Sequence, residues 1–162
     1  VLKLVLNENS QINVEVRKAY GIPEVITDRR PKCLFISYSG NTEETVEAVN
    51  DAIKHKLNWS VISSGGQLLE LAKDHKRPFV KVPPGLQPRA AFGLMTKAVM
   101  HYVSSDIDRK YLEMCDQAGD YLNEALANQS ENELQSQALQ ISKEIGSRTS
   151  VIYGGKIGRA HV

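Results

Sequence analysis

The amino-acid sequence predicts an α/β fold, a three-layer α/β/α arrangement in which helices cover both faces of a parallel sheet. Two features of its 162 residues support this prediction. Short apolar runs alternate along the chain with longer segments in which apolar residues recur at helical spacing. The run that begins at Cys33 is continuously apolar, which is typical of strands that are buried on both faces of a parallel sheet.

Strands are expected where apolar or alternating residues occupy only a few positions. Residues 12–16 alternate between apolar and polar side chains and predict a short strand, and residues 33–38 predict a buried one. Residues 59–62 and 79–82 are short apolar segments, the first of them followed by two serines and two glycines. Residues 150–154 predict a last strand that reaches a glycine-containing turn.

Helices are expected where apolar residues recur every three or four positions. Residues 1–8 have the pattern of the last turns of a helix, and an amphipathic helix is expected from about residue 41 to residue 56. Further helices are expected over residues 67–75, 90–104, 107–127 and 131–146.

The junction between the strand at 33–38 and the next helix carries an unusual density of polar side chains. Backbone N–H groups at a helix N-terminus, with hydroxyl groups beside them, form a ready site for a phosphate. A simpler interpretation is helix capping, with Asn41 and Glu44 as a capping-box-like pair. A cap needs one such residue and this loop has four, which favours binding of a phosphate or sugar phosphate. The residues are Ser37, Ser39, Asn41 and Thr42, arranged around Gly40.

Three segments of the sequence resemble a known family. The segment SYSGNTEET at 37–45 resembles the phosphosugar-binding loop of the sugar isomerase (SIS) domain family. The segments ISSGGQLLELA at 62–72 and VPPGLQPRAAFG at 82–93 narrow the resemblance to the bifunctional phosphoglucose/phosphomannose isomerases, a branch with two SIS domains. The resemblance covers residues 1–153 and implies a flavodoxin-like SIS fold that is truncated at both ends.

The resemblance also implies roles for individual residues. Ser37, Ser39 and Thr42 match the hydroxyl groups that bind the substrate phosphate, while Gly40 and Asn41 allow close approach of the backbone. Arg89 matches the arginine of the proline-rich segment, which contacts substrate near the reacting carbons. There a guanidinium can stabilise an enediolate oxygen.

An aldose–ketose isomerase that interconverts glucose 6-phosphate or mannose 6-phosphate with fructose 6-phosphate is the activity that the resemblance implies. It implies no cofactor and no metal, a hexose 6-phosphate as substrate, and a homodimer. The family takes its catalytic Glu, His and Lys from sequence that this chain does not contain, so the chain by itself is expected to be inactive. A regulatory SIS module that binds a phosphosugar without catalysis is the alternative.

The same resemblance divides the chain into parts. Residues 1–105 correspond to a first SIS domain that lacks its first strand, and residues 106–149 correspond to a helical connector. Residues 150–156 correspond to the start of a second SIS domain. Residues 157–162 do not resemble the family, and a widely used sequencing adapter can encode them, so we expect a tail that is not native.

The composition excludes several other functions. Twenty Lys and Arg residues against nineteen Asp and Glu leave a formal net charge of +1, so no global field favours nucleic acid or an anionic membrane. No apolar run approaches the length of a membrane span, and Cys33 and Cys115 lack metal-type spacing. We therefore expect a cytoplasmic protein without a metal site. No G-x-G-x-x-G motif follows a predicted strand, which counts against a dinucleotide-binding domain.

Overall fold

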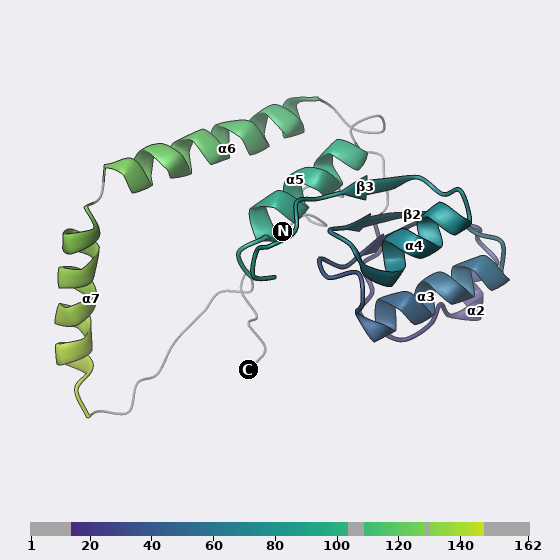
Figure 1. The fold of residues 1–162 in the computed structure, drawn as a ribbon, viewed down its shortest axis with the longest axis horizontal. Coiled ribbons are helices and arrows are strands. Elements are labelled where there is room, and N and C mark those ends of the chain that lie inside the picture. The colour runs from purple at the N-terminus through teal and green to yellow at the C-terminus, as the bar shows by residue number, and fades with distance from the viewer. Residues whose placement is uncertain (1–13, 104–108, 129, 148–162) are drawn as a thin grey trace. The chain divides into compact units, whose positions relative to one another are not determined.

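The computed structural model describes residues 14–103, 109–128 and 130–147. A three-stranded parallel sheet lies at its centre, with the strand order β1-β2-β3 (Figure 1). Its strands are β1 (Lys32–Ile36), β2 (Asn58–Ser63) and β3 (Phe79–Lys81). In the register of the sheet, Ile36 lies opposite Ile62, and Ile62 lies opposite Val80. All three strands therefore end at one edge of the sheet, where open α/β sheets bind ligands.

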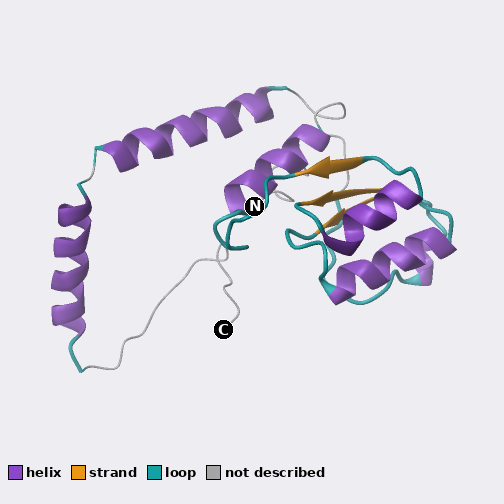
Figure 2. Cartoon of the chain, viewed as in Figure 1, coloured by secondary structure: helices purple, strands orange, loops and turns teal. Residues whose placement is uncertain are grey.

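Helices alternate with the strands and cover both faces of the sheet, which confirms the predicted α/β fold. The helices are α3 (Glu43–Lys54) between β1 and β2, α4 (Gly66–Asp74) between β2 and β3, and α5 (Phe92–Tyr102) after β3. Helices α3 and α4 lie beside each other on one face, whereas α5 covers the other (Figures 1 and 2).

Alternate residues of β2 contribute to the two apolar cores, because successive side chains of a strand point to opposite faces. Trp59 and Val61 are buried against the face of the sheet that α3 and α4 cover. Ile62 is buried on the opposite face against α5, and the Tyr102 hydroxyl donates to Ser60 Oγ at 2.8 Å on that face. Full burial of one such apolar side chain stabilises the fold by about 1.5–3 kcal/mol. The sheet is thereby fixed between two layers of helices.

The segment before β1 differs from the sequence prediction. Residues 14–16, the described part of the predicted strand at 12–16, are not a strand, and Val16 is exposed. An alternating pattern forms a strand only where a neighbouring strand provides hydrogen-bond partners, and within the described residues the sheet consists of β1, β2 and β3. The chain instead contacts α3, where Ile22 N donates to Asp51 Oδ2 at 3.0 Å. The short helix α2 (Glu24–Thr27) then follows Pro23 and was not predicted.

The described chain divides into two compact units, one up to Leu112 and one from Glu113 onward. Helix α6 (Lys110–Ala127) crosses this division, and α7 (Glu131–Ile145) belongs to the second unit. A capping box begins α7, since Ser130 Oγ accepts from Glu133 N and the Glu133 carboxylate accepts from Ser130 N. The predicted helix at 1–8, the strand at 150–154 and the tail at 157–162 lie outside the described residues.

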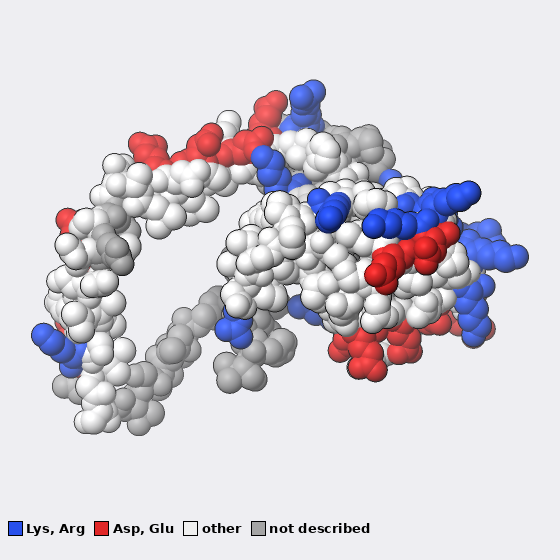
Figure 3. All heavy atoms as spheres, viewed as in Figure 1, with Lys and Arg blue, Asp and Glu red and all other residues white. Residues whose placement is uncertain are grey.

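The charged side chains on the surface and the hydropathy of the helices can both be compared with the sequence. On the visible face of the sheet unit, lysine and arginine side chains gather along the upper and right edges, whereas acidic ones form a band below them and a group at the lower edge (Figure 3). None of the helices that the structure describes is long and apolar enough to cross a bilayer.

Candidate functional site

The loop that joins β1 to α3, residues 37–42, is called the hydroxyl loop here. It begins one residue beyond β1, where Ser37 N still donates to Ile62 O at 3.2 Å, and Gly40 then turns the chain with φ of +72°. Two serines stabilise this turn, because Ser37 Oγ accepts from Gly40 N and Ser39 Oγ accepts from Asn41 N, at 3.2 and 3.3 Å. The hydroxyl groups are therefore held by the backbone of their own loop.

The structure brings together the three hydroxyl groups that the sequence singled out. Ser37 Oγ lies 2.7 Å from Thr42 Oγ1 and 3.5 Å from Ser39 Oγ. Ser37 is buried at the centre of this cluster, while Ser39 and Thr42 are exposed. Three hydroxyls around one point can each donate to a different oxygen of one phosphate group. Phosphate binding by these residues remains a prediction.

The N-terminus of α3 opens beside this cluster. Thr42 is its N-cap residue and no side chain caps the helix, so the interpretation of Asn41 and Glu44 as a capping pair for α3 is wrong. Within the described part of the chain, the N–H groups of Thr42, Glu43 and Glu44 have no acceptor. These free donors and the partial positive charge of the helix N-terminus favour an anion at this point.

Asn41 caps the neighbouring helix rather than its own. Its Oδ1 accepts from Gln67 N at 3.0 Å, and Gly40 O accepts from Leu68 N at 3.0 Å. Two N–H groups in the first turn of α4 thus find acceptors in the hydroxyl loop, and Gly65, the N-cap residue of α4, has no side chain to provide one. The side-chain oxygen of Asn41 has a structural role, which leaves its NH₂ group free to face a ligand.

Residues 63–66, which run from the last residue of β2 to the first residue of α4, are called the serine-glycine loop, and this segment contacts the hydroxyl loop. A Cβ at Gly40 would lie 1.8 Å from Gly65 O, so the two backbones meet too closely for any side chain. Ser63 is fully buried and donates to Gly65 O at 2.9 Å, and Ser64 Oγ donates to Tyr38 O at 2.6 Å. These hydrogen bonds to the backbone favour a role for both serines in forming the turn rather than in contacting a ligand.

Tyr38 is the residue that sequence reasoning missed. Its hydroxyl donates to Pro83 O at 3.0 Å and accepts from Leu86 N at 2.9 Å, so it connects the hydroxyl loop to residues 83–91, called the proline loop. The serine-rich motif gave no signal for this contact, because the partners lie 45 and 48 residues further along the chain.

Arg89 lies in a turn of the proline loop just before α5, between Pro88 and the fully buried Ala91. Its side chain is exposed and, among the residues that the structure describes, forms no hydrogen bond or ion pair. The loop that carries Arg89 is joined to the hydroxyl loop through Tyr38, whereas no hydrogen bond joins the guanidinium to Ser37, Ser39 or Thr42. The catalytic role of Arg89 remains a prediction.

Acidic side chains surround the N-terminus of α3. The carboxylates of Glu43 and Glu44, with a smaller contribution from Glu47, raise the pKa of the nearby exposed Tyr20 hydroxyl above its ordinary value. The same carboxylates stabilise the first turn of α3 but oppose binding of an anion there. Among the described residues, no group of three or more His, Cys, Asp or Glu side chains is placed to hold a metal ion.

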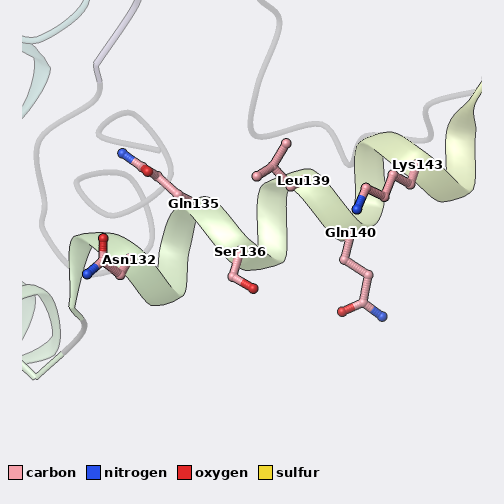
Figure 4. A pocket seen from close by; sticks show the side chains of 6 residues that line it. All are labelled: Asn132, Gln135, Ser136, Leu139, Gln140 and Lys143. Carbon is pink, nitrogen blue, oxygen red and sulfur yellow. The ribbon is translucent and has the colours of Figure 1, made fainter.

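One hollow in the surface lies beside α3, and a second lies on α7. The first, of ≈ 290 Å³, is lined mainly by the first two turns of α3, together with Asn41 and with Gln67 of α4. The other, ≈ 360 Å³, is lined only by residues of α7, and Figure 4 shows their side chains spread along that single helix. Neither hollow is lined by Ser37, Ser39 or Thr42, so neither of them marks the position of the hydroxyl cluster.

The chain is similar in sequence to curated proteins that are named as sugar-phosphate isomerases. It is 36% identical over 135 residues to a bifunctional phosphoglucose/phosphomannose isomerase of Thermoplasma acidophilum, covering 83% of this chain and 39% of the relative. It is 37% identical over 139 residues to the protein of that name from Aquifex aeolicus, covering 86% and 38%.

A shorter match, 37% over 73 residues, is to a D-glucosamine-6-phosphate 4-epimerase of Sulfolobus acidocaldarius, and it covers 43% of this chain and 23% of the relative. No family model matches the chain, and no solved structure matches it at a significant level. The chain spans about two fifths of the length of the first two relatives.

Proposed function

We propose that this chain, which belongs to the family of bifunctional phosphoglucose/phosphomannose isomerases, is the part of such an enzyme that binds the phosphate of a hexose 6-phosphate. The observation that supports this most directly is the cluster of three hydroxyls beside the free N–H groups of α3. We call the full-length protein that carries this chain the parent.

Binding exchanges one set of hydrogen bonds for another. In the structure Thr42 Oγ1 and Ser37 Oγ satisfy each other at 2.7 Å, and a phosphate oxygen would replace that contact with a charge-assisted one. Each hydrogen bond to a charged group contributes roughly 1.5–3 kcal/mol, and the helix N-terminus adds about 0.3–1 kcal/mol. Repulsion from Glu43 and Glu44 offsets part of this gain, so we expect moderate rather than tight binding.

The reaction of the parent is a proton transfer between C1 and C2 of the open-chain sugar. A base removes the proton from one carbon to form an enediolate, the proton returns to the other carbon, and a hydroxyl proton moves between O1 and O2 so that the carbonyl changes position. In this proposal Arg89 stabilises the negative oxygen of the enediolate, while the base and the group that opens the sugar ring lie outside this chain. The chain alone is then expected to bind phosphosugar weakly and to catalyse nothing.

The test of phosphate binding compares two threonines of the parent. Thr42→Val removes the hydroxyl without changing the shape of the side chain, and Thr45→Val is the matched control because Thr45 lies outside the hydroxyl loop. Titration calorimetry with glucose 6-phosphate should give a dissociation constant about 10- to 150-fold higher for Thr42→Val, which corresponds to one charged hydrogen bond. Equal affinity of the two variants would overturn the assignment of the hydroxyl loop.

The test of the reaction uses Arg89→Ala in a coupled assay with glucose 6-phosphate and mannose 6-phosphate. We expect kcat to fall more than the affinity for phosphate, because the proposed contact forms in the transition state. A raised KM with unchanged kcat would assign Arg89 to substrate binding instead. A parent that binds hexose 6-phosphate but converts neither sugar would favour a regulatory module over an enzyme.

A further inference from the structure

We propose that Tyr38 is a positioning residue whose hydroxyl holds the proline loop against the hydroxyl loop. It thereby positions Arg89 to stabilise the enediolate oxygen. This proposal rests on the proposed function, because the catalytic role of Arg89 is part of that function. The contact itself stands on geometry alone: one hydroxyl that donates to Pro83 O at 3.0 Å and accepts from Leu86 N at 2.9 Å.

The Tyr38 hydroxyl completes a turn that the proline loop does not close by itself. Pro84 and Gly85 occupy the two central positions of residues 83–86, and Gly85 has φ of +95°, the combination that a type II turn favours. In a closed turn Leu86 N would donate directly to Pro83 O. No such bond joins these two groups, and the hydroxyl of Tyr38 lies between them as acceptor for one and donor to the other.

Tyr38 is itself held in place, so it can act as an anchor. Its carbonyl oxygen accepts from Ser64 N at 3.0 Å and from Ser64 Oγ at 2.6 Å, which fixes its backbone to the serine-glycine loop. Its partly buried ring packs against the apolar core beneath α5. Ser37 and Ser39 flank it in sequence. One residue therefore contacts all three loops that follow the three strands.

Arg89 lies just after the part of the proline loop that is hydrogen-bonded to Tyr38. Leu86, three residues earlier, is held by the Tyr38 hydroxyl, and Ala91, two residues later, is fully buried. Between them Gln87 O accepts from Ala90 N and Ala91 N, at 2.9 and 3.1 Å. Arg89 is thus carried on a short turn that is fixed at both ends, and loss of the Leu86 contact would free one of them.

The first test measures the contact directly in the parent, by hydrogen exchange at the backbone amide of Leu86. Tyr38→Phe keeps the ring and removes only the hydroxyl. The matched control is Tyr102→Phe, which removes a tyrosine hydroxyl that donates to Ser60 Oγ in the middle of β2. The Leu86 amide should exchange roughly 3- to 10-fold faster in Tyr38→Phe and at the original rate in Tyr102→Phe. Unchanged exchange in Tyr38→Phe would overturn the proposal.

The second test asks whether Tyr38 acts through Arg89, by a double-mutant cycle on kcat. Tyr38→Phe should lower kcat of the parent and leave its affinity for inorganic phosphate unchanged. In the Arg89→Ala background the same substitution should have no further effect. A loss of kcat that is equal in both backgrounds would show that Tyr38 acts independently of Arg89, against the proposal.

The outcomes separate this proposal from the proposed function. If Arg89→Ala leaves kcat unchanged, the role of Arg89 in the reaction is wrong, and with it the part of the proposal that concerns catalysis. Exchange at the Leu86 amide still decides whether Tyr38 holds the proline loop. A Tyr38→Phe variant that loses phosphate affinity would mean that Tyr38 shapes the hydroxyl loop rather than the position of Arg89.

Discussion

Replacing Gly40 with alanine is expected to separate the hydroxyl loop from the serine-glycine loop. A Cβ at this position would lie 1.8 Å from Gly65 O and 2.7 Å from Ser63 Oγ. Both distances are far below van der Waals contact, and the nearer atom belongs to the backbone, so no side-chain rotation can relieve the clash. The loop must move, and with it the Gly40 carbonyl that accepts from Leu68 N.

Two terms give the size of the effect. Gly40 has φ of +72°, and an alanine in this left-handed region costs about 1–2 kcal/mol. Overpacking against a fixed neighbour costs a further 1–3 kcal/mol, roughly. The sum, about 2–5 kcal/mol, is a large fraction of the roughly 5–15 kcal/mol that separates folded from unfolded domains. Phosphosugar binding should also weaken, because Ser37 Oγ accepts from Gly40 N.

Two other glycines provide the controls. Gly85 also has a positive φ, +95°, but a Cβ there meets nothing within 4 Å, so Gly85→Ala isolates the backbone term at about 1–2 kcal/mol. Gly93 lies in the first turn of α5 with open space around it, and alanine there should be neutral or stabilising by up to about 1 kcal/mol. The measurement is urea unfolding of the parent and of each variant. If Gly40→Ala destabilises no more than Gly85→Ala, the close approach of the two loops is not what requires glycine.

Two further predictions concern helix N-termini. Asn41→Ala should lower the free energy of unfolding by about 1 kcal/mol, because α4 loses the acceptor for Gln67 N. Asn41→Asp keeps that acceptor and should retain stability, while its negative charge should weaken phosphate binding. Urea unfolding and calorimetry measure the two effects, and equal stability of Asn41→Ala and the original protein would contradict the capping role. In α7, hydrogen bonds from the Ser130 backbone and hydroxyl lower the pKa of Glu133. A lowered pKa means that the folded helix favours the carboxylate, so this stabilisation is present above the ordinary pKa of Glu and is lost as pH falls through the lowered one. An NMR titration should show the pKa of Glu133 returning toward its ordinary value in Ser130→Ala, and no change would count against the capping box.

The strands and helices of the sheet unit follow closely from the sequence. The predicted strand at 33–38 and the observed β1 (Lys32–Ile36) differ at the C-terminal end, where Ser37 and Tyr38 belong to the loop. The difference has a physical reason: Ser37 N still donates across the sheet, but its side chain has turned to the loop and accepts from Gly40 N. Apolar runs locate a strand well, and local side-chain hydrogen bonds decide where it ends.

The segment before β1 was harder to predict for the same kind of reason. The alternation at residues 12–16 suggested a strand, yet the described residues 14–16 form none. Helix α2 is a single turn of four residues, too short for any apolar periodicity to show. Both features depend on partners elsewhere in the chain, as the bond from Ile22 N to Asp51 Oδ2 illustrates across 29 residues.

The hydroxyl cluster was visible in the sequence because its members are neighbours, whereas the contacts that hold it were not. The sequence predicts that Asn41 lies at the substrate phosphate, but it gives no sign that the Asn41 oxygen also caps α4 across 26 residues. Tyr38 received no role, and its hydroxyl joins the proline loop across 45 residues. A motif shows which groups a loop carries, but their supporting partners depend on which strands lie side by side in the fold.

The strand order explains why these supports exist. Because β2 lies between β1 and β3, the serine-glycine loop lies between the hydroxyl loop and the proline loop at one edge of the sheet. It contacts the hydroxyl loop through Gly40 and Gly65, and it holds Tyr38 through Ser64. The position of a ligand bound by the outer two loops would therefore depend on the serine-glycine loop between them. The most buried side chain of that loop, Ser63, is closed to solvent, and its hydroxyl donates to a backbone oxygen. Substitutions in the serine-glycine loop should then change ligand affinity only by moving the two loops beside it. Residues that do not contact a ligand can affect its binding in this way.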